Sequence, residues 1–339
     1  MKFSWFFGGR RRPSDFMESF AAKRLPQVLA TIGRPPVAKI ELFPHGRHRS
    51  VYRVVLDDGS ALVLRIYLSD EPELRAVSHW HLNRLMADLG FCVPTIHFRG
   101  VFPFGRRGDD VHVTIEDFVE GKEVEAGLCD QPAIRRQMAE ILHLLHNKTA
   151  PRPGKPWVGS EKLELVLRMA EKAPVLFRRI RAQLPEVTSQ QATQCLKWIR
   201  ENVARRPVPQ EYELIYGGFD ARDLLLTPQG RIALIDTGSI AFDVFETDLV
   251  DARWGFLDQA WFEDFCADYF ALAPFRRERY ERDAPIYFAR FYLNTAASRA
   301  VRARKNIEKG KHEEAEFFRA ESRRFWNWLI SVVEGGALS

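Results

Sequence analysis

The first third of the chain carries short apolar segments with polar turns between them, a pattern typical of β-strands. Three strands are predicted at Lys39–Phe43, Ser50–Leu56 and Ala61–Tyr67. Asp57–Gly59 predicts a tight hairpin turn between the last two, because Asp-Gly readily adopts positive φ. Two more strands are predicted within Phe91–Gly121. The N-terminal part of the chain is therefore expected to be rich in β-structure.

Apolar residues recur at helical spacing through most of the remaining sequence. The predicted helices are Phe16–Gly33, Glu71–Gly90, Gln131–Asn147, Glu161–Leu184, Ser189–Ala204, Trp254–Leu272 and further helices between Arg276 and Val333. A Pro- and Gly-containing stretch, Pro151–Pro156, predicts a linker before the two middle helices. At 339 residues the chain is long enough for two lobes that share one cleft.

Three acids gather in one stretch between these helices. Residues 214–226 and 231–239 read as two short apolar strands with a polar turn, which brings Asp220, Asp223 and Asp236 towards one place. Hard oxygen ligands suit Mg²⁺, which prefers to share its shell with phosphate oxygens. The alternative is a surface hairpin whose acids are simply solvated.

The spacing of this stretch resembles the catalytic and metal-binding segment of the aminoglycoside phosphotransferase and choline kinase family, a branch of the protein-kinase-like fold. Members read His-Gly-Asp-x-x-x-x-Asn-Leu-Leu and then Ile-Asp-x-Gly. Tyr216 stands where the family has His, Gly218 where it has the catalytic Asp, and Asp223 where it has the metal-binding Asn. Asp236 matches the second metal-binding Asp. The resemblance implies an α+β, bilobal protein-kinase-like fold, with a small β-rich N-lobe and a larger, mostly helical C-lobe.

The departures from the family pattern bear on activity. In kinase-type phosphoryl transfer the loop Asp accepts the proton of the acceptor hydroxyl, and Gly218 has no side chain for this. Asp220 is the candidate substitute base, since residues i and i+2 of an extended segment point to the same side. It lies roughly 6–7 Å further along such a segment, so its use requires a different loop path. Asp223 keeps an oxygen ligand for metal.

The resemblance also assigns a nucleotide site to the N-lobe. Gly46 lies in the loop that would cover the nucleotide, and Arg65 matches the strand cation that reaches its phosphates. The family's helix places a Glu beside that cation, at a position near Ser78 or His79 here. Neither residue is acidic, so the ion pair that positions the cation is expected to be lost.

Two further segments match the family in order. Glu116 and Phe118 lie in the hinge that joins the lobes, where backbone groups would hydrogen-bond an adenine edge. Asp248 matches an acid that braces the catalytic loop. His143 and His146 lie three apart at the end of the helix Gln131–Asn147, where the resemblance implies packing and loop support and the alternative is a pair of metal ligands. The expected domains are an N-terminal arm and helix at 1–37, the N-lobe at 38–120 and the C-lobe at 121–339, with a helical insert at about 157–206 and the catalytic-loop region at 212–250.

Charge and composition narrow the choice of partners. The formal net charge of +5 favours acidic partners such as nucleotides or anionic lipid, and no nucleic-acid-binding module is recognised. The four scattered cysteines fit a reducing compartment, and no apolar run reaches the roughly 18 residues that span a bilayer. A cytoplasmic location is therefore expected. Aromatic residues and three arginines within Met1–Arg12 suggest either contact with the inner face of an anionic membrane or a loose terminal arm.

Three functions follow from these observations. The leading hypothesis is a kinase-like protein that retains nucleotide and Mg²⁺ binding through Arg65, Asp223 and Asp236, has lost most or all phosphotransfer, and acts by binding or scaffolding. The alternative is an active ATP-dependent phosphotransferase that uses Asp220 on a hydroxyl of a small molecule, sugar or lipid. A third hypothesis is a membrane-edge adaptor. The expected partners are a nucleotide and either an unknown small-molecule acceptor or a protein.

Overall fold

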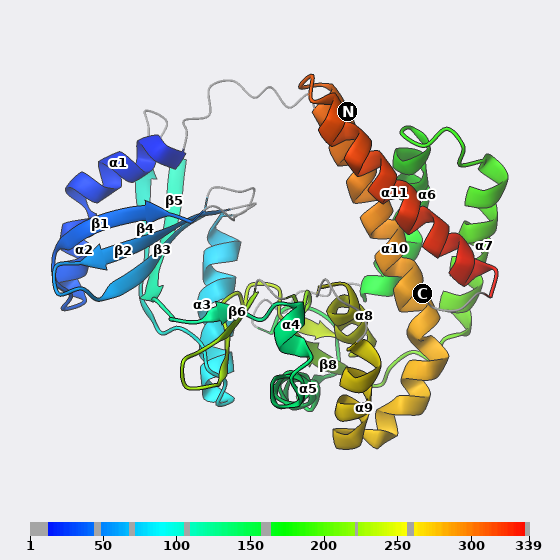
Figure 1. Cartoon of the computed structure of the whole chain (residues 1–339), viewed down its shortest axis with the longest axis horizontal. Coiled ribbons are helices and arrows are strands. Elements are labelled where there is room, and N and C mark those ends of the chain that lie inside the picture. Colours follow the sequence, from blue (N-terminus) through cyan, green and yellow to red (C-terminus); the bar gives the residue numbers. More distant parts are fainter. Residues whose placement is uncertain are drawn as a thin grey trace. The chain divides into compact units, whose positions relative to one another are not determined.

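The computed structural model divides the chain into two compact units (Figure 1). The first unit contains Met1–Val124 and Arg222–Gly238, and the second contains Glu125–Ala221 and Ser239–Ser339. The structure describes residues 13–43, 49–67, 72–104, 109–156, 164–220, 223–255 and 261–335. Gly46 and the segment Met1–Arg12 lie outside the described residues.

The first unit is built on an antiparallel sheet of five strands in the order β1-β2-β3-β5-β4. The strands are β1 (Val37–Leu42), β2 (Arg49–Leu56), β3 (Ala61–Tyr67), β4 (Ile96–Phe104) and β5 (Asp109–Asp117). The predicted turn is present, with Gly59 at φ 83°. Three helices accompany the sheet: α1 (Pro13–Lys23), α2 (Leu25–Thr31) and α3 (Pro72–Asp88).

The two faces of this sheet differ in character. Leu64 and Ile66 of β3 lie on the face that packs against apolar residues of α1 and α2, such as Phe20. Arg65 pairs with Thr114 across β3 and β5 and therefore lies on the opposite face, because successive side chains of a strand alternate. The polar side chains of Arg65, Thr114 and Glu116 thus lie on the face away from α1 and α2.

The sequence predicts one helix at Phe16–Gly33, and this is wrong, because α1 ends at Lys23 and α2 begins at Leu25. Pro26 occupies the first turn of α2, where its missing N–H costs nothing and its fixed φ favours a new helix start.

A second, small sheet completes the first unit. It joins β6 (Lys122–Glu123), β9 (Leu224–Leu226) and β10 (Ile232–Leu234) in the order β10-β9-β6. Ala233 of β10 also forms a bridge with Cys92. The hairpin β9–β10 therefore belongs with the large sheet, although about a hundred residues of the second unit precede it in the chain.

The second unit is mostly helical. Its helices are α4 (Ala126–Cys129), α5 (Pro132–His146), α6 (Leu165–Arg181), α7 (Ser189–Arg205), α8 (Glu246–Gly255), α9 (Phe262–Leu272), the 3-10 turn η2 (Pro274–Arg276), α10 (Arg277–Ile307) and α11 (His312–Val333). A small sheet has the order β11-β8-β7, from β7 (Thr149–Ala150), β8 (Tyr212–Ile215) and β11 (Ala241–Asp243). The sequence placed residues 214–226 and 231–239 in one hairpin, but β8 pairs with β7 and β11 instead.

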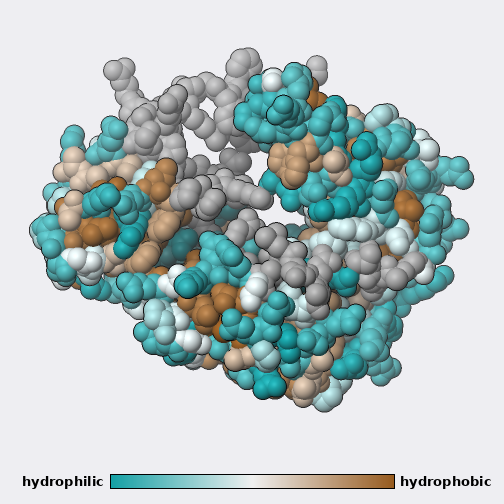
Figure 2. Space-filling model, in the orientation of Figure 1, coloured by the Kyte–Doolittle hydropathy of each residue, from teal (hydrophilic) through white to brown (hydrophobic). Residues whose placement is uncertain are grey.

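The mixed fold, with one β-sheet unit and one helical unit, confirms the predicted fold class. On the face drawn in Figure 2, hydrophobic residues form separate patches among hydrophilic ones. No helix within the described residues combines the length and the apolar character needed to cross a membrane.

Candidate functional site

Arg65 is the central cation of the first unit. It is 8% exposed, because the middle of β3 lies between β2 and β5. Its Nε donates a hydrogen bond to Glu116 Oε1 at 2.6 Å, and its Nη2 donates to the carbonyl oxygen of Ile235 at 2.8 Å. Burial alone would lower the pKa of Arg65, but the nearby carboxylates of Glu116 and Asp223 outweigh it and raise the pKa. The guanidinium is therefore held both charged and fixed in direction.

Glu116 of β5 supplies the carboxylate that the sequence did not find on the helix. Its second oxygen, Oε2, accepts a hydrogen bond from Nε2 of His79 on α3 at 2.7 Å, and both side chains are 1% exposed. Burial favours the neutral acid, but Arg65 and His79 outweigh it and lower the pKa of Glu116 to about 2. Arg65 is thus paired after all, with a strand acid instead of a helix acid.

The two predicted metal ligands lie at one end of the β9–β10 hairpin. The carbonyl oxygen of Asp223 accepts the N–H of Ile235 at 2.9 Å, which places Asp223 beside the residue before Asp236. Oδ1 of Asp236 accepts the N–H of Gly238 at 3.1 Å, which fixes this carboxylate against its own turn. Within the described residues there is no group of three potential metal-binding side chains. Two carboxylates nevertheless fit Mg²⁺, which commonly takes one or two from the protein and completes its shell with phosphate and water.

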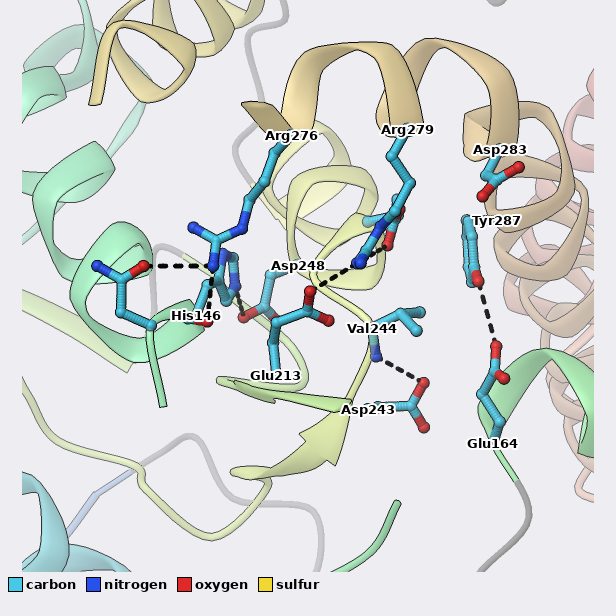
Figure 3. A network of polar contacts seen from close by, with 12 residues as sticks. His146, Glu164, Glu213, Asp243, Val244, Asp248, Arg276, Arg279, Asp283 and Tyr287 are labelled. Atoms are coloured by element: carbon cyan, nitrogen blue, oxygen red, sulfur yellow. Dashed lines mark hydrogen bonds and ion pairs between the residues drawn. The ribbon is translucent and has the colours of Figure 1, made fainter. Parts of the chain in front are cut away.

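The loop that contains Gly217 and Gly218 lies in the second unit and is held by Asp248. Its carboxylate accepts the N–H groups of Tyr216 at 2.6 Å and Gly217 at 2.8 Å. His146 Nε2 donates to the same carboxylate at 3.2 Å, and Tyr269 O–H donates to His146 Nδ1 at 2.7 Å. Burial lowers the pKa of His146, so the neutral ring with its proton on Nε2 serves both contacts. Figure 3 shows His146 and Asp248 facing one another.

Two glycines shape the same loop. Gly217 has φ +75°, and a Cβ there would lie 2.8 Å from the carbonyl oxygen of Ser239. Gly218 has φ +129°, a conformation that side-chain-bearing residues rarely adopt, although a Cβ there would meet nothing within 4 Å. Gly218 thus has no side chain, and its backbone conformation is unsuited to a residue that carries one. Asp220, two residues on, is partly exposed.

The structure distributes the predicted site residues over both units. Arg65, Glu116, Phe118, Asp223 and Asp236 belong to the first unit, and Gly218 and Asp220 belong to the second. The ring of Phe118 lies 4.6 Å from the guanidinium carbon of Arg53 and 6.4 Å from the ring of Phe43. Within the first unit, Arg65, Glu116 and the hairpin acids come together through the bond from Arg65 to Ile235.

An extensive ionic network in the second unit was not predicted (Figure 3). Arg279 contacts Glu213 at 2.8 Å and Glu246 at 2.6 Å, linking α10 to β8 and α8. Arg276 donates to the carbonyl oxygen of His146 at 2.7 Å. The sequence gives no signal for these contacts, because each joins residues that are far apart in the chain. They lie around His146 and Asp248 and hold the supports of the loop in place.

Comparison with known proteins identifies the family. A model of the phosphotransferase enzyme family matches residues 39–282 of this chain. A search of curated proteins finds none that matches significantly.

Solved structures of similar fold include several kinases. A putative fructosamine-3-kinase from Haemophilus somnus 129PT is 12% identical with a TM-score of 0.63, covering 91% of this chain and 99% of its own. The GDP complex of aminoglycoside 2'-phosphotransferase-IIIa is 14% identical with a TM-score of 0.62, covering 92% and 99%. A ternary complex of the aminoglycoside phosphotransferase APH(4)-Ia with ADP and hygromycin B is 15% identical with a TM-score of 0.59, covering 89% and 97%. These similarities establish a kinase-like fold, and the family match extends over most of the sequence: the chain belongs to the phosphotransferase enzyme family.

Proposed function

We propose that this protein binds a nucleoside triphosphate with Mg²⁺ in the first unit and has lost most or all phosphotransfer, acting through ligand-dependent binding to a partner. The observation that carries the first part is the junction at Ile235. Its carbonyl oxygen accepts from Arg65, and its N–H donates to Asp223. One residue therefore ties the phosphate-reaching cation to both candidate metal ligands.

The residues of this junction suit a metal–phosphate complex. Asp223 and Asp236 would hold Mg²⁺ by carboxylate oxygens, and the bound ion would neutralise charge on the phosphates. Arg65 would grip phosphate oxygens, since a guanidinium presents several donors in a planar fork. Some of the family structures described above contain GDP or ADP, which supports a nucleotide as the ligand.

The loss of phosphotransfer rests on Gly218. A proton acceptor has to lie within hydrogen-bond reach of the acceptor hydroxyl, and glycine supplies none. The φ of +129° also disfavours an aspartate at this position without a change in the loop. An active phosphotransferase that uses Asp220 remains the second candidate, because positioning and charge neutralisation supply most of the catalysis in this chemistry.

Titration calorimetry tests the binding proposal. Non-hydrolysable analogues of ATP and GTP are titrated into wild type, Asp236→Asn and the control Asp88→Asn, with and without Mg²⁺. Asp88 is an exposed acid at the end of α3, so its substitution changes the net charge equally without touching the junction. We expect Mg²⁺-dependent binding in wild type and Asp88→Asn that Asp236→Asn weakens at least tenfold. Equal binding by Asp236→Asn would contradict the assigned metal site, and no binding by wild type would refute the proposal.

Turnover separates the two candidate functions. Wild type is incubated with Mg²⁺ and ATP, and ADP release is followed in the presence of amino sugars and other small hydroxyl compounds. Release stimulated by an acceptor, and abolished by Asp220→Asn while nucleotide binding persists, would favour the active enzyme over the binding protein.

A further inference from the structure

We propose that Glu116 of β5, with His79 of α3 behind it, is the positioning residue that holds Arg65 for the phosphates of the bound nucleotide. The acid that orients the cation has thus moved from a helix to a strand. This inference rests on the proposed nucleotide binding and goes beyond it, because it assigns the orientation of the phosphate-binding cation to two residues with no assigned role of this kind.

The carboxylate of Glu116 is bonded through both of its oxygens, to Arg65 and to His79. One oxygen accepts from Arg65 Nε at 2.6 Å and the other from His79 Nε2 at 2.7 Å. A carboxylate only accepts hydrogen bonds, so Nε2 of His79 must carry a proton. Both oxygens therefore have a donor, and the carboxylate has little freedom to rotate away from Arg65.

The guanidinium of Arg65 is fixed by two hydrogen bonds, to Glu116 and to Ile235. Its two bonds leave from different nitrogens, Nε towards Glu116 and Nη2 towards Ile235, and together they fix the plane of the guanidinium. Within the described part of the chain, Arg65 makes no hydrogen bond through Nη1. The side chain is 9% exposed, so Nη1 has a fixed direction and its N–H groups remain available for a phosphate. A lysine in this place would have a single nitrogen to divide between the acid and a phosphate, whereas arginine serves both.

Burial of the charged Glu116 carboxylate is unfavourable in free energy. Glu116 and His79 are each 1% exposed, and burying a charge is unfavourable unless partners compensate for it. An apolar side chain in this row of the sheet would avoid that cost. The pairing therefore serves Arg65, which would otherwise be a buried cation with no carboxylate bonded to it.

Helix α3 is linked to Arg65 through His79 and Glu116. His79 lies in the middle of α3, so the position of this helix sets the carboxylate of Glu116 and, through it, the guanidinium. Asn83, one turn further along α3, donates to the carbonyl oxygen of Pro94 at 2.9 Å and anchors the helix to the segment that leads into β4. A displacement of α3 would therefore move the carboxylate of Glu116 and, with it, the guanidinium of Arg65.

The test uses three full-length variants. Glu116→Gln keeps the size of the side chain but removes its charge. The double variant Glu116→Gln with His79→Glu returns a carboxylate to the helix and leaves an amide between it and Arg65. Glu120→Gln is the control, because Glu120 is exposed just beyond β5. Circular dichroism and thermal unfolding establish that each variant is folded.

Titration with the Mg²⁺ complex of a non-hydrolysable ATP analogue gives the first readout. We expect Glu116→Gln to raise Kd about tenfold or more, which corresponds to about 1.4 kcal/mol. The double variant should recover at least a third of that loss on a logarithmic scale, and Glu120→Gln should bind as wild type does. Wild-type affinity in folded Glu116→Gln, or a double variant no better than Glu116→Gln, would overturn the proposal.

The second readout is independent of nucleotide. In ¹⁵N-labelled protein the Nε–H of Arg65, assigned through Arg65→Lys, should exchange slowly with solvent in wild type and Glu120→Gln. It should exchange rapidly in Glu116→Gln. Rapid exchange in wild type refutes the positioning role even if no Glu116 variant folds. Wild type that shows the slow signal but binds no nucleotide refutes the proposed function and the ligand assigned here, and leaves the Arg65–Glu116 pair established.

Discussion

Removal of the Asp248 carboxylate should release the loop that contains Gly217 and Gly218. The carboxylate is fully buried and accepts three hydrogen bonds, from the N–H groups of Tyr216 and Gly217 and from Nε2 of His146. Asp248→Ala removes every acceptor. Asp248→Asn keeps the shape and one oxygen, but it turns an N–H₂ group towards groups that also donate.

The magnitude follows from these contacts. A hydrogen bond to a charged group contributes about 1.5–3 kcal/mol, and a buried donor left without an acceptor costs about 1–3 kcal/mol. Because the three bonds share one carboxylate they are not additive, and we expect Asp248→Ala to lower the free energy of unfolding by about 3–5 kcal/mol. Asp248→Asn should lower it by about 2–3 kcal/mol, since at least one donor loses its partner.

Two measurements check this prediction. Urea unfolding followed by circular dichroism gives the change in stability, with Glu186→Gln as the control. Glu186 pairs with Arg323 at the surface, where the two side chains are 45% and 51% exposed, so its loss should cost less than about 1 kcal/mol. Hydrogen exchange of the peptide spanning residues 212–220 should quicken at least tenfold in Asp248→Asn. A variant within about 0.5 kcal/mol of wild type with unchanged exchange in this peptide would refute the assigned role.

Three further predictions concern the second unit and its loops. Gly217→Ala should lose about 1–3 kcal/mol in chemical unfolding, because positive φ combines with a 2.8 Å approach to Ser239, whereas Gly310→Ala, at φ +72° in open space, should lose only about 1 kcal/mol. Burial and the charge of Glu164 raise the pKa of Asp243 to about 7, so below that pH its carboxyl stays protonated in the folded state while the unfolded carboxyl ionises near pH 4. As the pH rises from about 4 to about 7, wild type should therefore lose up to about 1.4 kcal/mol of stability per pH unit relative to Asp243→Asn; parallel stability curves of the two proteins would contradict this. Thr188→Ala removes the capping box of α7 and should lower stability by about 1 kcal/mol in thermal unfolding, and no change in Tm would show that the cap is not needed.

Local signals predicted much of the architecture. The strands on either side of Asp57–Gly59 and most helices follow from periodicity and turn chemistry, which depend on neighbouring residues alone. The break between α1 and α2 was also readable, because Pro26 favours a helix start. The placement of β8 was not, since its strand partners are supplied by segments distant in the sequence.

The candidate site shows the same limit. Spacing suggested Arg65, Asp223 and Asp236 as candidate site residues, and the partner of Arg65 was sought on the helix at the position of His79. Glu116 lies 51 residues from Arg65, and only the pairing of β3 with β5 brings the two together. A motif defined by spacing along the chain cannot show a contact between a cation and an acid on another strand.

The discontinuous first unit has a consequence for synthesis of the protein on the ribosome. Its large sheet is complete once β5 has emerged, but Arg65 gains its contact with Ile235 only after more than a hundred further residues are translated. At about 5–20 residues per second this delay lasts roughly 5–20 seconds. Throughout that interval the nascent chain displays the polar face of the sheet without its second hairpin, while α5, α6 and α7 emerge. The unit that comes first in the gene is thus completed only after residues 125–221 of the second unit have been translated, and a fragment ending at residue 124 would stay in that unfinished state.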